Sequence, residues 1–152
     1  MNRINEVIFD LSERLDAPLH VDDNGACQLI FDEEMSITLE MDDSEQLLYL
    51  VSPVCDLPPG KFRARVLFEA LRANSEIPPL GHFSYLAKIG RLVLCDTLEG
   101  EWQEGDKCLA RVVALYEKAA LWKKAIDAGQ MAPQEALQRG SGAPSSMFGI
   151  QK

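Results

Sequence analysis

The sequence predicts an α+β fold in which a five-stranded antiparallel sheet is combined with three helices, in the order helix, three strands, helix, two strands, helix. Short segments alternate apolar and polar residues, which is the two-residue period of a strand with one buried face. The clearest is Met35–Met41, where every odd-numbered residue is apolar. Longer segments before, between and after the strands repeat apolar residues every three or four positions, as amphipathic helices do.

The first predicted helix runs from Asn2 to Leu15. Its apolar residues recur at helical spacing and form one stripe: Ile4, Val7, Ile8, Leu11 and Leu15. Either Asn2 or Asn5 can cap its start, and Pro18 lies just beyond its end. Phe9 lies beside the stripe, so it either widens the apolar face or offers a contact to a partner.

Three strands follow, separated by short polar turns, which is typical of an antiparallel meander. They are predicted at Cys27–Phe31, Met35–Met41 and Gln46–Val54. The third strand is apolar on both faces over Leu47–Val51. It is therefore either a central strand covered on both sides or a strand with one face left for a partner.

The second half alternates helix and strand again. A helix is predicted at Lys61–Asn74, with Leu67, Phe68 and Leu71 on one side and Phe62, Val66 and Ala70 on another, so it has contacts on two sides, one of them a candidate for a second subunit. Two strands, His82–Ile89 and Arg91–Leu98, form a hairpin at Gly90, and a long helix runs from about Asp106 to Ala128. We therefore predict one domain over residues 1–128. Residues 129–152 are rich in Gly, Pro and Ser, and predict a flexible tail with one helical turn around Pro133–Arg139.

Length and charge limit the classes of function. A chain of 152 residues with 47% hydrophobic residues is long enough for one domain with a sizeable core. The net charge of −9 and a pI near 4.7 argue against nucleic acid, because phosphate binding needs clustered Lys and Arg. The sequence has no signal-peptide layout and no apolar run of membrane-spanning length, so we expect a cytoplasmic protein that does not bind membranes.

Residues that could carry catalysis or bind a metal are few. The four cysteines form no C-x-x-C pair, and neither His20 nor His82 lies at ligand spacing from them. The acidic clusters fall in predicted turns and lack the ligand pattern of a calcium loop. We expect no metal, no cofactor and no enzyme activity, although a Cys–His pair assembled by folding stays open as an alternative. The remaining feature is apolar surface for binding a protein.

The order of elements resembles the class I type III secretion chaperones, the Tir-chaperone or CesT-like family. The residues that carry the resemblance extend over about 1–128: Phe9 and Leu11 in the first helix, Cys27–Phe31 with Ile37–Leu39, Leu48–Leu50, the helix segment Arg65–Leu71, and Leu80–Phe83 leading into Leu92–Leu94. The segment after Gly129 is longer than the resemblance requires.

The resemblance implies a homodimer without ATPase activity of its own, which binds the N-terminal chaperone-binding segment of a secreted effector in a largely extended state. Such binding combines strand addition with anchors in apolar grooves. A contact between the tail and the secretion ATPase stays open. The alternative function is a general interaction adaptor of the same fold with a non-secretory client.

Candidate residues for these contacts come from the two apolar regions. The predicted dimer interface contains Phe62, Val66, Phe83 and Tyr85. The predicted effector-binding residues are Phe9, Ile30, Leu48 and Leu50, while Leu29, Ile37 and Leu39 are expected in the core. The competing interpretation is that all these side chains complete the core of one chain.

Overall fold

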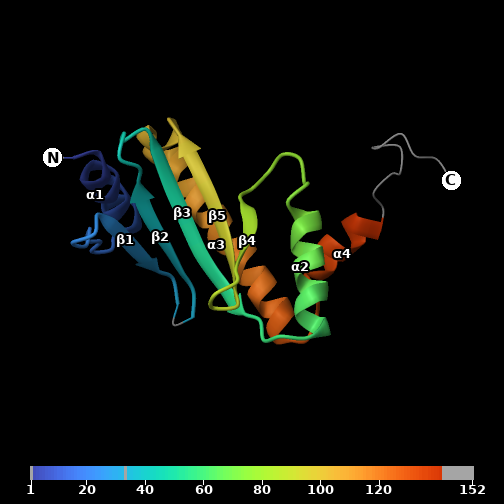
Figure 1. Cartoon of the computed structure of the whole chain (residues 1–152). Helices are drawn as coiled ribbons and strands as arrows, with labels where there is room; N and C mark the ends of the chain where they lie inside the picture. The colour runs from blue at the N-terminus through green and yellow to red at the C-terminus, as the bar shows by residue number, and fades with distance from the viewer. Residues whose placement is uncertain (1, 33, 142–152) are drawn as a thin grey trace.

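The computed structural model describes residues 2–32 and 34–141, and it has the predicted order of elements with one further helix at the end (Figure 1). The helices are α1 (Arg3–Leu15), α2 (Lys61–Ala73), α3 (Gly105–Asp127) and α4 (Gln134–Ser141), and a 3₁₀ turn (η1) spans Glu101–Gln103. The strands are β1 (Ala26–Ile30), β2 (Ser36–Met41), β3 (Leu47–Asp56), β4 (His82–Leu86) and β5 (Arg91–Glu99).

The five strands form one antiparallel sheet in the order β1-β2-β3-β5-β4. The three strands of the meander lie side by side, and the hairpin of β4 and β5 attaches to it through β5, so β1 and β4 are the two edges. Its register places Leu39 opposite Leu50 and Leu48 opposite Leu98. Since side chains alternate along each strand, this register directs the leucines to one face.

Helices cover that inner face of the sheet. α3 crosses β3 and β5, and α1 packs against α3 and β2. α2 lies beyond this layer, against the edge strand β4, and α4 packs against α2 at the same end of the molecule (Figure 1). The structure therefore has a two-layer body and a helical extension at the β4 edge.

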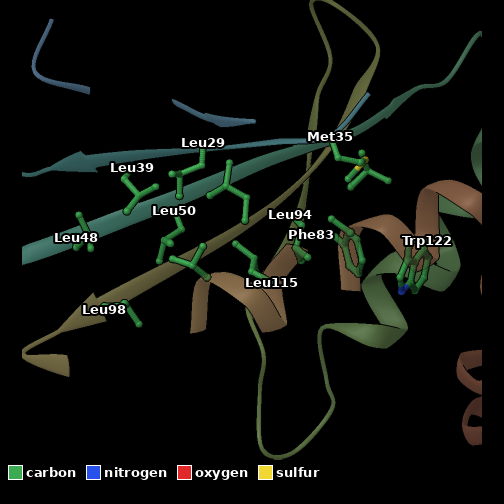
Figure 2. Close-up of a cluster of buried hydrophobic side chains, with 14 of the residues drawn as sticks. Leu29, Met35, Leu39, Leu48, Leu50, Phe83, Leu94, Leu98, Leu115 and Trp122 are labelled. Atoms are coloured by element: carbon green, nitrogen blue, oxygen red, sulfur yellow. The ribbon is translucent and has the colours of Figure 1, made fainter. Parts of the chain in front are cut away.

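The core lies between the inner face of the sheet and α3. Figure 2 shows leucines from four strands pointing toward Leu115 of α3, with Phe83 and Trp122 packed on each other farther along the helix. The largest side chains with almost no exposed surface include Leu11, Ile37, Leu39, Leu48, Leu50, Leu92, Leu94, Leu98, Val112 and Leu115. The core positions predicted for Leu29, Ile37 and Leu39 match this arrangement.

The start of α1 settles the choice between two caps. The Asn2 side-chain oxygen accepts a hydrogen bond from the Asn5 backbone N–H at 3.1 Å, so Asn2 is the cap. Asp16 ends the helix in the left-handed conformation, with φ 49°, ahead of Pro18.

The segment after Gly129 differs from the predicted flexible tail as far as Ser141. Ala132 and Pro133 are buried, and Ala136 and Leu137 of α4 pack against the core. The predicted helical turn is thus a helix of eight residues. The remainder of the predicted tail, residues 142–152, lies outside the described residues.

Replacing Leu50 with Ala tests the core. The side chain is fully buried between β3 and α3, so its loss leaves a cavity, and we expect the free energy of unfolding to fall by about 2–5 kcal/mol. Tyr49→Thr, on the opposite face of the same strand, should cost less than about 1 kcal/mol. Chemical denaturation measures both, and equal losses would contradict the assignment of faces.

Truncation tests the role of α4. A chain that ends at Gly129 loses the buried Ala132 and the contacts of Leu137, so we expect it to be less stable by about 1–3 kcal/mol. A chain that ends at Ser141 keeps both and should melt within a degree or two of the full chain, because it loses none of these contacts. Calorimetry measures the melting temperatures of the two truncated chains. Equal melting temperatures would mean that α4 adds no stability.

Candidate functional site: the exposed apolar surfaces

The predicted effector-binding residues divide into two groups in the structure. Leu48 and Leu50 of β3 are fully buried and face α3 (Figure 2), so the expectation that they line an open groove is corrected: they belong to the core of one chain. The physical reason is the alternation of β3, whose even-numbered residues from Leu48 to Val54 point inward. A ligand could reach these two leucines only by displacing α3.

Phe9 and Ile30 are, in contrast, largely exposed. Phe9 is 63% exposed on α1, on the side away from the buried stripe, and Ile30 is 72% exposed at the end of β1. α1 and β1 lie at the same end of the sheet (Figure 1). Ile30 lies on the outer face of the sheet, because Leu29 beside it points inward, and Phe9 lies on the outside of α1, so the two side chains flank the β1 edge from opposite sides. We call this edge with Phe9 and Ile30 the α1–β1 surface. It is a candidate binding surface because an added peptide strand has side chains on both faces.

β1 contributes more than Ile30, because it is an edge strand. Strand order leaves one side of β1 without a neighbouring strand in the described chain, and an unpaired edge presents backbone donors and acceptors to an extended peptide. The outer face of the sheet next to it is mixed in character, with Gln28 and Glu40 exposed beside the half-buried Thr38.

Acidic turns hold both ends of β1. Asp22 accepts hydrogen bonds from the N–H groups of Asn24 and Ala26 at 2.8 and 3.0 Å, before the strand. Asp32, after the strand, accepts N–H bonds from Glu34 and Met35 and an O–H bond from Tyr116. The bond from Glu34 is the main cause that lowers the pKa of Asp32, so this carboxylate stays charged well into acid.

A hollow between α1, η1 and the start of α3, of about 450 Å³, is the polar neighbour of this surface. Its two arginines already have partners. Arg14 pairs with Asp10 and Asp106, and Arg3 lies over the Trp102 ring and bonds to Glu45. Gly105 sits beneath the first of these pairs, where a Cβ atom would meet the Asp10 carboxylate. This contact fixes α1 to α3 and leaves little that would hold an apolar anchor.

The predicted dimer residues also divide. Val66 and Phe83 are buried in the core of one chain, because α2 turns the side with Val66 toward β4 and the body, and Phe83 packs on Trp122. Their assignment to the dimer interface is corrected on that ground. Tyr85 is half-buried under Arg63, which donates to its hydroxyl at 3.0 Å, and Phe62 is partly exposed.

The exposed side of α2 holds two apolar residues outside the predicted interface set. Phe68 is 60% exposed and Leu71 is 69% exposed, three residues apart on one side of the helix. The sequence predicts both residues on one apolar side of α2, but it does not show which of the two sides of the helix faces outward. Their burial is decided by the position of α2 on β4. These two residues form the α2 surface, whereas Phe62 lies on the Val66 side at the start of the helix.

Other chemistry has little support in the described residues. Burial raises the pKa of Cys108 to about 11, and burial likewise raises the pKa of Cys55 to about 11, so both thiols are protonated and weakly nucleophilic at neutral pH. Within residues 2–32 and 34–141, no group of three or more His, Cys, Asp or Glu side chains is placed to hold a metal ion. The helices of the same region include none long and apolar enough to cross a membrane.

An acidic α+β domain with a free edge strand and exposed apolar side chains is suited to binding other proteins. The family model of the Tir chaperone protein (CesT) family matches residues 6–120. The chain therefore belongs to this family, the class I type III secretion chaperones. No curated protein matches the chain in sequence.

Solved structures agree with this fold. A chain of the HopA1–SchA chaperone–effector complex has a TM-score of 0.64 at 21% identity, covering 80% of this chain and 93% of that one. A chain of the ExsC–ExsE complex has a TM-score of 0.61 at 23% identity, covering 80% of this chain and 92% of that one. A third structure is that of the Yersinia pestis type III secretion chaperone SycH in complex with a stable fragment of YscM2. Its matching chain has a TM-score of 0.60 at 16% identity, covering 76% of this chain and 96% of that one.

Proposed function

We propose that the protein binds the N-terminal chaperone-binding segment of one or more type III effectors and keeps that segment soluble and competent for secretion. The observation that carries the proposal is the family match over residues 6–120. Two similar structures are a chaperone–effector complex and a type III secretion chaperone with a bound fragment, which supports the same role here. The exposed side chains on α1 and β1 give this role a location.

The effector segment binds along the α1–β1 surface. It adds a strand to the free edge of β1 and covers Ile30 and Phe9 with its own apolar side chains. Backbone hydrogen bonds to an edge do not depend on the client's sequence, so the two apolar anchors and the charges around them decide which segment fits. With Asp22 and Asp32 at the two ends of β1, a client strand flanked by Lys or Arg is favoured.

The same proposal includes a homodimer formed through α2. Phe68 and Leu71 expose large apolar side chains on the outward side of α2, and Phe62 adds a partly exposed ring at the start of the helix on the Val66 side. A symmetric contact would place this α2 surface against its copy, with each patch covering the other. Tyr85 and Arg63 lie at the base of α2 and can border the contact.

The protein acts in the bacterial cytoplasm as a binding partner without catalysis in this proposal. Its clients are there before secretion, and a reducing compartment suits the free cysteines. A contact with the secretion ATPase is an open part of the proposal.

Replacing Ile30 with Asp tests the client surface. The side chain is exposed, so the fold should keep its stability, whereas a client would have to cover an unpaired charge. We expect the loss of at least about 2 kcal/mol of binding free energy. Fluorescence anisotropy with a labelled N-terminal effector segment measures it, with Ile89→Asp on the β4–β5 hairpin as the matched exposed control.

Equal affinity of the two variants for the effector segment would show that the client does not bind at β1. If effector segments failed to bind the unmodified protein while a non-secretory client bound it, the adaptor function would be the correct one.

Replacing Leu71 with Asp tests the α2 surface. Two carboxylates would face each other across a symmetric contact, so we expect the mass in solution to fall to 16.9 kDa, one chain. Light scattering at micromolar concentration measures the mass, and circular dichroism checks the fold. A dimer that persists in both Leu71→Asp and Phe68→Asp would show that copies associate elsewhere.

A further inference from the structure

A hollow of about 290 Å³ lies at the end of the molecule that carries α2 and α4, away from α1 and β1 (Figure 1). Three segments that are distant in sequence supply its apolar walls: Leu121 and Trp122 of α3, Pro133 and Ala136 around the start of α4, and Leu80 of the loop between α2 and β4. Trp122 also packs on Phe83 of β4, the edge strand opposite β1. We call this cavity the α3–α4 hollow.

The walls of the hollow leave apolar surface uncovered. Leu121 is 46% exposed, whereas Trp122 and Pro133 beside it are buried and Leu80 is half-buried. The volume of the hollow is just below the range of about 300–1,000 Å³ that is usual for sites enclosing a whole small molecule. The hollow therefore suits one large apolar side chain of a protein segment better than a free metabolite.

The rim of the hollow is acidic. Glu117 of α3 and Glu135 of α4 are exposed there. Lys118 also lines the hollow, but it donates to the Leu80 carbonyl at 2.9 Å and lies 4.0 Å from the Glu76 carboxylate, so its charge is balanced within the chain. The negative potential over the opening favours an apolar side chain that has Lys or Arg next to it.

The α2 surface of a second copy is the alternative occupant, because it also combines apolar and basic side chains. The arginines of α2 are, however, partly committed within their own chain. Arg72 pairs with Glu69 at 3.1 Å and lies over the Phe68 ring, and Arg63 donates to the Tyr85 hydroxyl. A segment of another protein has no such internal contacts to give up and matches the rim better.

We propose that the α3–α4 hollow binds a segment of another protein in which a Phe or Leu side chain has Lys or Arg on both sides. The apolar side chain lies against Leu121 and Trp122, and the cations lie over Glu117 and Glu135. Because the hollow and the α1–β1 surface are at opposite edges of the sheet, this partner binds independently of a client on β1. Leu121, Trp122 and the residues around the start of α4 also lie beyond the matched range 6–120.

NMR titration of the full-length protein with the end-blocked peptide Gly-Lys-Phe-Lys-Gly tests the proposal. The two tryptophans give an internal reference, because Trp122 lines the hollow, whereas Trp102 belongs to η1 and donates to the Gln46 carbonyl. We expect the indole N–H signal of Trp122 to shift in a saturable way, with a dissociation constant of about 1 mM or below, while the Trp102 signal stays in place. The same peptide with Ser in place of Phe should shift neither signal.

Matched variants separate the apolar contact from the charges. Leu121→Ser removes an exposed apolar wall without adding a charge, so the fold should persist and the peptide should bind about fivefold more weakly. Leu86→Ser on β4, which is 44% exposed and outside the hollow, is the control and should leave the affinity unchanged. Replacing Glu117 and Glu135 together with Gln should weaken binding about threefold at low salt and reduce its dependence on salt.

The proposal is overturned if the two tryptophan signals respond alike, or if Leu121→Ser binds the peptide as well as Leu86→Ser does. It is equally overturned if the unmodified protein ignores the peptide while Leu121→Ser lowers the mass measured by light scattering, because a second copy would then fill the hollow. Ile30→Asp should leave peptide binding unchanged. Failure of the client site and failure of the hollow are therefore separate results.

Discussion

The packing of α3 across β3 and β5 is the contact on which the rest of the structure depends. Val112, Leu115 and Ala119 of α3 have no exposed surface, and they cover the inner face that carries Leu50 and Leu94. α1 rests on α3 as well as on β2, so its position also depends on this contact. The sheet cannot bury its apolar face by itself. It needs a second layer, which α3 and α1 supply.

This use of the inner face restricts where the protein can bind others. Once α3 and α1 cover it, the exposed apolar side chains include Phe9, Phe68 and Leu71 on helix exteriors and Ile30 on an edge strand. The strand order separates two such surfaces, because β1 and β4 are opposite edges and α2 lies against β4. An effector on the α1–β1 surface and a second copy on the α2 surface would therefore not compete for the same residues.

The sequence predicted the helices and strands well, because the spacing of apolar residues that marks them involves only neighbouring positions in the chain. The start of α2 at Lys61 and the end of β2 at Met41 are as expected. β4 ends earlier than predicted because the turn before Gly90 takes more residues. The site was predicted less well. β3 is apolar at Leu47, Leu48, Leu50 and Val51, so alternation could not show which face α3 would take. The same ambiguity placed Val66 outward on α2, although β4 lies against that side.

The ordered segment after Gly129 shows a different limit of sequence reasoning. Ala132 and Pro133 are buried, but small residues and proline are also what flexible linkers contain, so composition alone predicted a tail. Small side chains bury little area individually, yet they allow close approach of the chain to α3. That approach places α4 against α2 and forms a hollow of about 290 Å³ lined by residues as distant in sequence as Leu80 and Ala136. Because neither an apolar stripe nor a turn motif encodes such a contact, only the tertiary arrangement could reveal it.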